Sequence, residues 1–434
     1  MDKMADVLGR AGAWCGQNKY LSAIKNAFQN FMPLTIAGAI GVLWCNVLVN
    51  DQTGLGLFFK PIMALDFLNP AFQAVNFCTI SCITVGITLG IAQEIGVWNM
   101  GAERAGYIPG LVGLAAWLSV TNTSHMVEGA KEAFTGIAGN ELGATGLFTG
   151  MIIGVLSVEL FCFFEKQDAL KIKMPEQVPP GVARAFEVLV PATITLIITA
   201  CIGSACYNLT GLYLNDVIKN GIQGPLGAVG ATIPGVMIIY LVIMLFWLVG
   251  IHGNNMLSAV KEALFTPLAL ENVEKFNKGE KPTNIINMYF LQMCGEFGGS
   301  GVTIGLVIAI MIFGKREDNK AIATLSLVPG LFNINETVTF GVPMVLNPIL
   351  GIPFVVAPLI TIIIGYVLTV IGFCPVACLT VPWTTPPIVF GFLACGANVM
   401  GAVTQAILIV VSTVIYVPFL ISYEKYQNKQ AVEA

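Results

Sequence analysis

Polar side chains interrupt an otherwise apolar stretch of this chain at residues 331–348. Glu336 lies there with three asparagines, among them Asn333 and Asn335, and two prolines leave backbone carbonyls without helical partners. Carboxylates, amides and free backbone groups are the acceptors and donors that bind the hydroxyls of a polyhydroxylated solute. The pattern therefore predicts a solute-binding site. The alternative is a structural re-entrant loop whose polar groups bond one another.

A histidine occupies a second unusual position, at the end of an apolar run. His252 is followed by Gly253, Asn254 and Asn255, so it stands at a helix break beside two amides. A lone histidine on an apolar helix is usually a packing residue, but this setting predicts that His252 and Asn254 bind the solute. Trp247, five residues earlier, is expected either to offer its ring to a sugar or to belong to an interfacial aromatic belt.

Other polar or aromatic residues in apolar surroundings give weaker signals. Trp383 stands among prolines and is either a platform on which a sugar stacks or a rigid external turn. Glu296 precedes a glycine-rich break, residues 298–301, and Ser300 within that break is also predicted to bind the solute. Glu296 is expected either to line the same cavity or to pair with Lys261. Glu159 is assigned to helix packing.

The elements that must position these residues are membrane helices. Of the 434 residues, 56% are hydrophobic and 11% are charged, whereas about a quarter of the residues of a soluble protein carry charge. The net charge of −4 would repel phosphate. This composition excludes a soluble enzyme, a disordered chain and a nucleic-acid binder, and predicts an all-α polytopic membrane protein.

Cysteine usage and motifs limit the chemistry that the chain can carry. No CxxC occurs and the two histidines lie far from the cysteines, so no metal site is expected. No P-loop, Gly-x-Ser-x-Gly or HExxH motif occurs either, so we expect no cofactor, no phosphorylated residue and no catalytic machinery of the chain's own. Small buried thiols are expected at the cysteines inside apolar runs: Cys78, Cys82, Cys162, Cys201, Cys206, Cys374 and Cys378.

Eight runs are apolar enough to cross a bilayer, which takes about 20 residues. They are residues 29–50, 72–93, 105–121, 146–164, 186–207, 231–250, 350–374 and 401–423. Two further apolar regions, 283–314 and 321–348, are broken by glycines or by polar residues. If the N-terminus is cytoplasmic, all Lys and Arg residues except Lys60, Lys131 and Lys219 fall on the cytoplasmic side, as the positive-inside rule requires.

This topology constrains the broken regions. Lysines before and after residues 283–314 belong to the cytoplasm, so each broken region is a re-entrant hairpin or a pair of short spans. Irregular backbone at membrane depth occurs only where protein buries it or where it lines a wet cavity. The site is therefore expected in a C-terminal transport domain, residues 231–434. Residues 1–230 are expected to form an N-terminal membrane domain that ends in an amphipathic connector.

Seven stretches, in order along the chain, make it resemble enzyme IIC, the membrane subunit of the bacterial phosphoenolpyruvate-dependent sugar phosphotransferase system, in its lactose/cellobiose/diacetylchitobiose branch. The stretches are residues 22–28, 32–38, 178–186, 250–253, 298–301, 332–336 and 382–386. The resemblance implies a homodimer of about ten transmembrane helices and two hairpins, with the N-terminal spans at the dimer interface. It also implies that a cysteine-phosphorylated IIB subunit, charged through IIA and the histidine phosphocarrier protein, phosphorylates a primary hydroxyl of the bound sugar.

The resemblance also implies roles for individual residues. His252 and Glu336 would bind near the phosphorylated hydroxyl, and Trp247 and Trp383 would stack on the sugar. Asn333 and Asn335 would supply further hydrogen bonds. Two departures from the family pattern lie beside the site: Thr337 follows Glu336 where proline is common, and Asn254-Asn255 replaces a commoner small pair.

The expected function is that of a sugar permease subunit in the bacterial inner membrane, with both termini cytoplasmic. Its substrate would be a β-linked disaccharide such as diacetylchitobiose or cellobiose. One alternative is an ion-coupled secondary sugar transporter that uses Glu336 or Glu296 as its proton site. Another is a channel or membrane sensor that needs no energy source.

The topology gives a direct prediction. A single cysteine introduced at Lys278 or Lys320 should react with an impermeant thiol reagent only from the cytoplasmic side, and one at Lys131 only from outside. Labelling of position 320 from outside would show that the broken regions do not both cross the membrane an even number of times.

Overall fold

The computed structural model of the chain describes residues 10, 13, 14, 17–51, 56, 59–125, 134–175, 177–342 and 344–433. This part is mostly helical, and its strands are the antiparallel pair β1 (Ser124–His125) and β2 (Phe134–Thr135). Contacts divide the chain into two compact units, each coherent within itself. Unit 1 comprises Met1–Gly16, Ile36–Asn76 and Ala228–Ala434, and unit 2 comprises Gln17–Thr35 and Phe77–Gly227. The sequence-based division into residues 1–230 and 231–434 stays a prediction.

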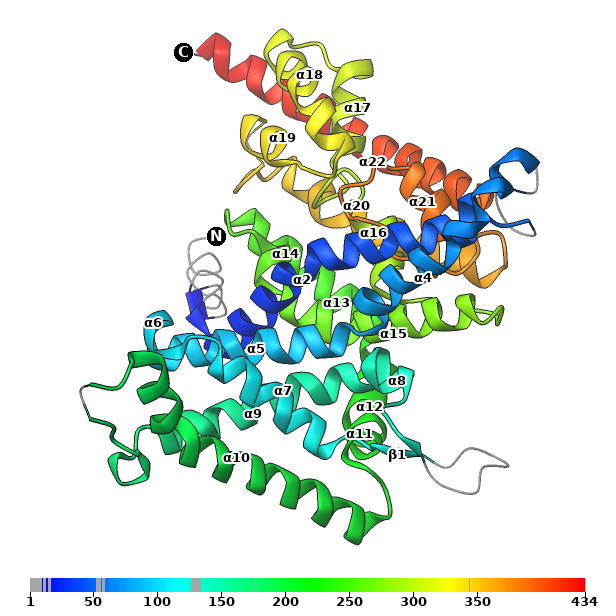
Figure 1. The fold of residues 1–434 in the computed structure, drawn as a ribbon. Helices are drawn as coiled ribbons and strands as arrows, with labels where there is room; N and C mark the ends of the chain where they lie inside the picture. The colour runs from blue at the N-terminus through cyan, green and yellow to red at the C-terminus, as the bar shows by residue number, and fades with distance from the viewer. Residues whose placement is uncertain are drawn as a thin grey trace. The chain divides into compact units, whose positions relative to one another are not determined.

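Unit 2 is built around four helices that pack on one another, α5 (Ile83–Met100), α7 (Ile108–Val120), α9 (Ala144–Glu165) and α10 (Pro180–Thr210) (Figure 1). Small residues let the backbones approach, as is usual between membrane helices. A Cβ atom built on Gly113 of α7 would lie only 2.3 Å from the Cβ of Ala92 on α5. Shorter elements complete the unit: η3 (Phe77–Ser81), α6 (Ala102–Ala105), α8 (Gly139–Leu142), η4 (Asp168–Leu170), α11 (Leu214–Ile218) and η5 (Lys219–Gln223).

Two carboxylates on α9 of unit 2 are paired with basic side chains. Glu165 is buried and accepts hydrogen bonds from Arg104 and Arg184, both at 2.9 Å, which ties α6, α9 and α10 together. Glu159 forms an ion pair with Lys19 at 2.6 Å. A charge in apolar surroundings is stable only when it is paired, so these carboxylates are accounted for within unit 2.

Unit 1 surrounds a large apolar core. Its helices after Ala228 are α13 (Ile233–Leu248), α14 (Gly253–Met256), α15 (Ser258–Asn277), α16 (Met288–Gly295), α17 (Ile304–Phe313), α18 (Glu317–Leu331), α19 (Glu336–Gly341), α20 (Gly351–Val370), α21 (Val389–Ala394) and α22 (Val399–Glu433). Before Asn76 it holds η1 (Trp44–Leu48), η2 (Lys60–Leu68) and α4 (Asn69–Asn76). Two helices cross the boundaries between units, α2 (Lys19–Leu43) and α12 (Gly224–Gly230).

Both predicted helix breaks are confirmed. The first separates α16 from α17, and in it Gly298, Gly299 and Gly301 have φ of +70°, +89° and +79°. Such angles are open to glycine and strained for most other residues. The second break separates α18 from α19, and Asn333 there has φ of +62°, which asparagine tolerates better than most residues.

Each of the eight predicted spans coincides at least in part with a helix, but their lengths differ from the expectation. Among the described residues, five helices are long and apolar enough to cross a membrane: Lys19–Leu48, Ala144–Glu165, Pro180–Thr210, Gly351–Val370 and Val399–Lys429. A sixth results if Lys60–Ser81 and Ile83–Met100 form one broken span. Helices α7 and α13 have 13 and 16 residues, fewer than a straight crossing needs, and the total of about ten spans stays a prediction.

The cysteine expectation is partly wrong. Cys162, Cys374 and Cys378 are buried as expected, but Cys78 and Cys201 are exposed. An apolar run shows that a residue belongs to a membrane helix but does not distinguish the side packed on protein from the outward side. The exposed thiols lie on the outward side. Lys131, placed outside by the topology, falls beyond the described residues.

Candidate sugar-binding site

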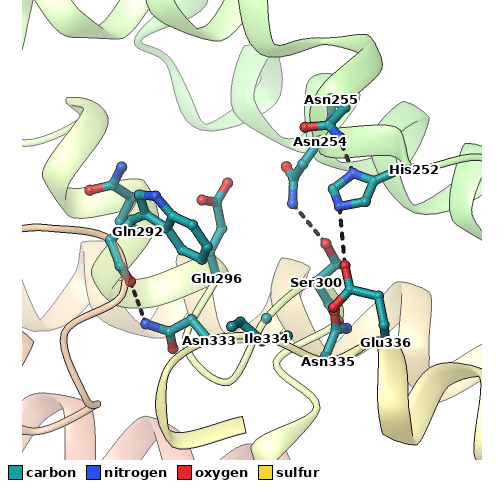
Figure 2. Close-up of a pocket in the computed structure, with 12 residues that line it drawn as sticks. His252, Asn254, Asn255, Gln292, Glu296, Ser300, Asn333, Ile334, Asn335 and Glu336 are labelled. Atoms are coloured by element: carbon teal, nitrogen blue, oxygen red, sulfur yellow. Dashed lines mark hydrogen bonds and ion pairs between the residues drawn. The ribbon is translucent and has the colours of Figure 1, made fainter. Parts of the chain in front are cut away.

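A cavity of about 210 Å³ lies within unit 1, at the two helix breaks (Figure 2). Seven of the eight residues predicted for the site line it. The complete lining is His252, Asn254, Asn255, Gln292, Glu296, Gly299, Ser300, Asn333, Ile334, Asn335, Glu336 and Trp383. Its lining of amides, carboxylates, a hydroxyl and an imidazole is suited to hydroxyl groups.

His252 is positioned by the end of α13. The chain reverses at Gly250, where φ is +81°, and His252 then caps α14 by accepting a hydrogen bond at Nδ1 from the N–H of Asn255 at 3.2 Å. An imidazole nitrogen that accepts carries no proton, so the proton of the neutral ring is on Nε2. Nε2 faces Glu336 Oε1 at 3.9 Å (Figure 2).

The gap between His252 and Glu336 is the central feature of the cavity. At 3.9 Å the two groups are too far apart for a direct hydrogen bond. The Glu336 side chain is 49% exposed, and no hydrogen bond joins its carboxylate to another described residue. A donor and a free acceptor thus face the same space. A hydroxyl group can accept a hydrogen bond from His252 Nε2–H and donate one to the Glu336 carboxylate.

Trp247 is the one predicted site residue that does not line the cavity. It is only 2% exposed, and its ring lies 4.4 Å from the ring of His252, centroid to centroid. It also meets Phe354 edge to face at 6.3 Å. In this structure Trp247 supports His252 from behind, and its stacking on a sugar stays a prediction.

The asparagines of the site hold its frame together. Asn333 accepts a hydrogen bond from the N–H of Gly298 at 2.6 Å and donates to the carbonyls of Trp383 and Thr385. Asn335 is buried and donates to the carbonyl of Ser300 at 2.7 Å. These bonds join the two breaks and the 383–385 turn. For Asn333 and Asn335, therefore, the structural alternative holds, in which the polar groups of the loop bond one another.

Glu296 fulfils both expectations made for it, because it lines the cavity and pairs with Lys261. Lys261 is 6% exposed, and it also donates to Asn254 Oδ1 at 3.2 Å. Tyr240 donates its hydroxyl to Glu296 Oε1 at 2.7 Å, and Asn254 continues the network to Ser300 Oγ at 2.8 Å. The cavity thus contains one compensated carboxylate, Glu296, and one without a salt-bridging lysine or arginine, Glu336.

Sequence reasoning missed Asn255, Gln292, Gly299 and Ile334 as lining residues. Gln292 had a readable signal, since it is a polar residue in the middle of the apolar run Met288–Gly295. Within the described ranges, no group of three His, Cys, Asp or Glu side chains is arranged to hold a metal ion.

The buried pair yields a prediction about stability. Lys261→Met should leave the Glu296 charge uncompensated and destabilise the fold by about 3–5 kcal/mol, because burial of an unpaired charge is strongly unfavourable. Adding Glu296→Gln should restore most of the loss, which thermal unfolding in detergent would measure as a double-mutant cycle. Equal destabilisation of the single and double variants would show that Lys261 acts by packing alone.

Comparisons with known proteins identify the family. The family model described as Phosphotransferase system, EIIC, matches residues 25–358. The oligo-beta-mannoside-specific EIIC component of Bacillus subtilis (strain 168) is 32% identical, over 100% of this chain and 97% of that protein. The cellobiose-specific EIIC component of Lactococcus lactis subsp. lactis (strain IL1403) is 30% identical, over 98% of each.

A solved structure agrees with these relatives. The crystal structure of ChbC, the IIC component from the N,N'-diacetylchitobiose-specific phosphotransferase system, matches with a TM-score of 0.87 and 29% identity over 96% of each chain. Fold and sequence therefore agree along nearly the whole length. The chain belongs to the EIIC family of the phosphotransferase system and is a multi-pass membrane protein of the sugar-translocating kind.

Proposed function

We propose that this EIIC component takes up a β-linked disaccharide and presents a primary hydroxyl of that sugar, held between His252 and Glu336, to a phosphorylated IIB subunit. The observation that supports this most is the 3.9 Å gap between His252 Nε2 and Glu336 Oε1. An Nε2–H donor on one side and a carboxylate acceptor on the other match the acceptor and donor of a single hydroxyl.

The same arrangement suits phosphoryl transfer. When the hydroxyl oxygen attacks the phosphorus of a cysteinyl phosphate, its proton must leave, and a carboxylate already accepting that hydrogen bond is placed to receive it. Glu336 is the suitable group because no lysine or arginine in the described part of the chain pairs with it, whereas Glu296 is paired with Lys261. The chain supplies position and a proton acceptor, and the phosphorylated partner supplies the reactive bond.

The names of the relatives support a β-linked substrate. The three relatives described above are named for oligo-β-mannoside, cellobiose and N,N'-diacetylchitobiose. We propose a disaccharide of this class, bound by the hydroxyl-binding lining of the cavity. Trp383, at the cavity wall, and Trp247, behind His252, are proposed to provide its aromatic contacts.

The wider setting of the proposal follows from the family. We propose a homodimer in the bacterial cell membrane, with both termini cytoplasmic and its interface formed by spans before residue 210. IIA and the histidine phosphocarrier protein would recharge the IIB subunit. Residues 1–230 would then be the static domain, and residues 231–434 the part that carries the site across the membrane.

Uptake into sealed vesicles tests the energy source. Transport of cellobiose that requires internal phosphoenolpyruvate, the phosphocarrier protein, IIA and IIB, and that delivers sugar phosphate, is the expected result. Uptake of unmodified sugar that collapses when the proton gradient is removed would instead establish an ion-coupled transporter.

The site itself is tested by substitution. Glu336→Gln keeps the shape and one acceptor oxygen but removes the charge, so sugar affinity should fall about tenfold, or about 1.4 kcal/mol. His252→Ala should weaken binding comparably in calorimetric titrations of the detergent-purified protein. Glu159→Gln is the matched control, since that carboxylate pairs with Lys19 in unit 2. Loss of binding in Glu159→Gln, with Glu336→Gln unchanged, would show that the sugar binds in the other half of the chain.

A further inference from the structure

Gln292 is a polar side chain of the cavity that neither frames the helix breaks nor faces the gap between His252 and Glu336. It lies on α16, a helix of eight residues, and the seven remaining residues of that helix are all buried. Gln292 alone is partly open, and it is open to the cavity. The helix therefore presents one functional group to the site.

The side-chain oxygen of Gln292 lacks a partner. Its Oε1 is buried, yet no described residue donates a hydrogen bond to it. Buried polar atoms are normally bonded, so an exception beside a cavity points to a bond with a ligand. Three of the four cavity asparagines provide the contrast, because Asn254, Asn333 and Asn335 bond to protein groups, while the fourth, Asn255, is exposed. Gln292 thus lines the cavity and carries an acceptor to which no described residue donates, and rotation of its terminal amide would turn that acceptor toward a ligand.

The backbone that carries Gln292 is held firmly. Gln405 on α22 donates to the carbonyl of Met293 at 3.1 Å and accepts from the N–H of Gly391 at 2.8 Å. At the other end of α16, Asn287 caps the helix and donates to the carbonyl of Ala377 at 3.0 Å. A polar group on such a support is pre-organised, so little order must be gained when a ligand binds.

The position of Gln292 identifies the part of the ligand that it meets. In Figure 2, Gln292 and Asn333 lie on one side of the cavity and His252 and Glu336 on the other, with Glu296 between them. A sugar ring whose primary hydroxyl is held by His252 and Glu336 leaves the Gln292 side to the next ring. Asn333 is not a competing acceptor, because its oxygen already binds Gly298.

We propose that Gln292 is a specificity-determining residue for the second sugar ring, and that its Oε1 accepts a hydrogen bond from a hydroxyl of that ring. This inference rests on the proposed function, which places the first ring at His252 and Glu336. It assigns selection of disaccharides over single sugars to an acceptor distinct from the groups that hold the phosphorylated hydroxyl.

Binding to the purified full-length protein tests this division. Gln292→Met keeps the length of the side chain but removes the acceptor, and should weaken binding of cellobiose and β-1,4-mannobiose about tenfold. Binding of methyl β-glucoside, which fills one ring position, should be unchanged in Gln292→Met and lost in His252→Ala. Equal losses for one-ring and two-ring ligands in Gln292→Met would overturn the inference, since they would indicate general distortion.

Monodeoxy cellobioses, each lacking one hydroxyl of the second ring, allow a double-mutant cycle between protein and ligand. The cycle compares affinities within each protein, so its result does not depend on how well Gln292→Met folds. One derivative should bind the parent about tenfold more weakly than cellobiose, and should bind Gln292→Met with no further loss relative to cellobiose. Every derivative losing the same factor in both proteins would overturn the inference and leave the proposed function intact. Failure of the parent to bind any disaccharide would overturn the proposed function, and the inference with it.

Discussion

The structure of the site depends on one constraint, namely that backbone groups freed by a helix break in apolar surroundings must find partners within the protein. The loop between α16 and α17 meets it through side chains from distant segments and through one of its own, Thr303. Asn333 accepts from the Gly298 N–H, Asn335 and Tyr416 donate to the carbonyls of Ser300 and Gly301, and Thr303 donates to the Gly298 carbonyl. The polar residues that satisfy the breaks are thereby concentrated at one place, and the cavity forms among them.

The charged groups of the cavity are subject to the same constraint, because they too need partners within the protein or exposure to the cavity. An unpaired buried charge is unfavourable, and Glu296 is compensated by Lys261 and by the hydroxyl of Tyr240. The side chain of Glu336 is half exposed, and no described lysine or arginine pairs with it. The protein thus separates a carboxylate that maintains the frame from one that is free to meet a ligand.

Sequence patterns predicted the helix breaks well, because glycines and asparagines clustered inside an apolar run disfavour a continuous helix. They also singled out His252 and Glu336 separately, as polar residues in apolar runs, whereas the resemblance to the enzyme IIC family implied that the two meet at one hydroxyl. They did not distinguish amides that frame a site from amides that face its ligand. Asn333 and Gln292 look alike in the sequence, but only the fold shows that the oxygen of Asn333 is bonded and that of Gln292 is not.

The sequence likewise did not predict the side of a helix on which a residue lies. Trp247 precedes His252 by five residues, yet it packs behind the histidine ring instead of lining the cavity. The same limit applies to the exposed Cys78 and Cys201. Apolar periodicity is weak where both lipid and protein surroundings favour apolar side chains.

We propose above all that the space between His252 and Glu336 holds a primary hydroxyl of the sugar. The most direct measurement is the affinity of a cellobiose that lacks the phosphorylatable primary hydroxyl, for the parent protein and for Glu336→Gln. We expect the parent to bind this analogue about tenfold more weakly than cellobiose, and Glu336→Gln to bind the two sugars equally. Equal affinity of the parent for both sugars would contradict the claim.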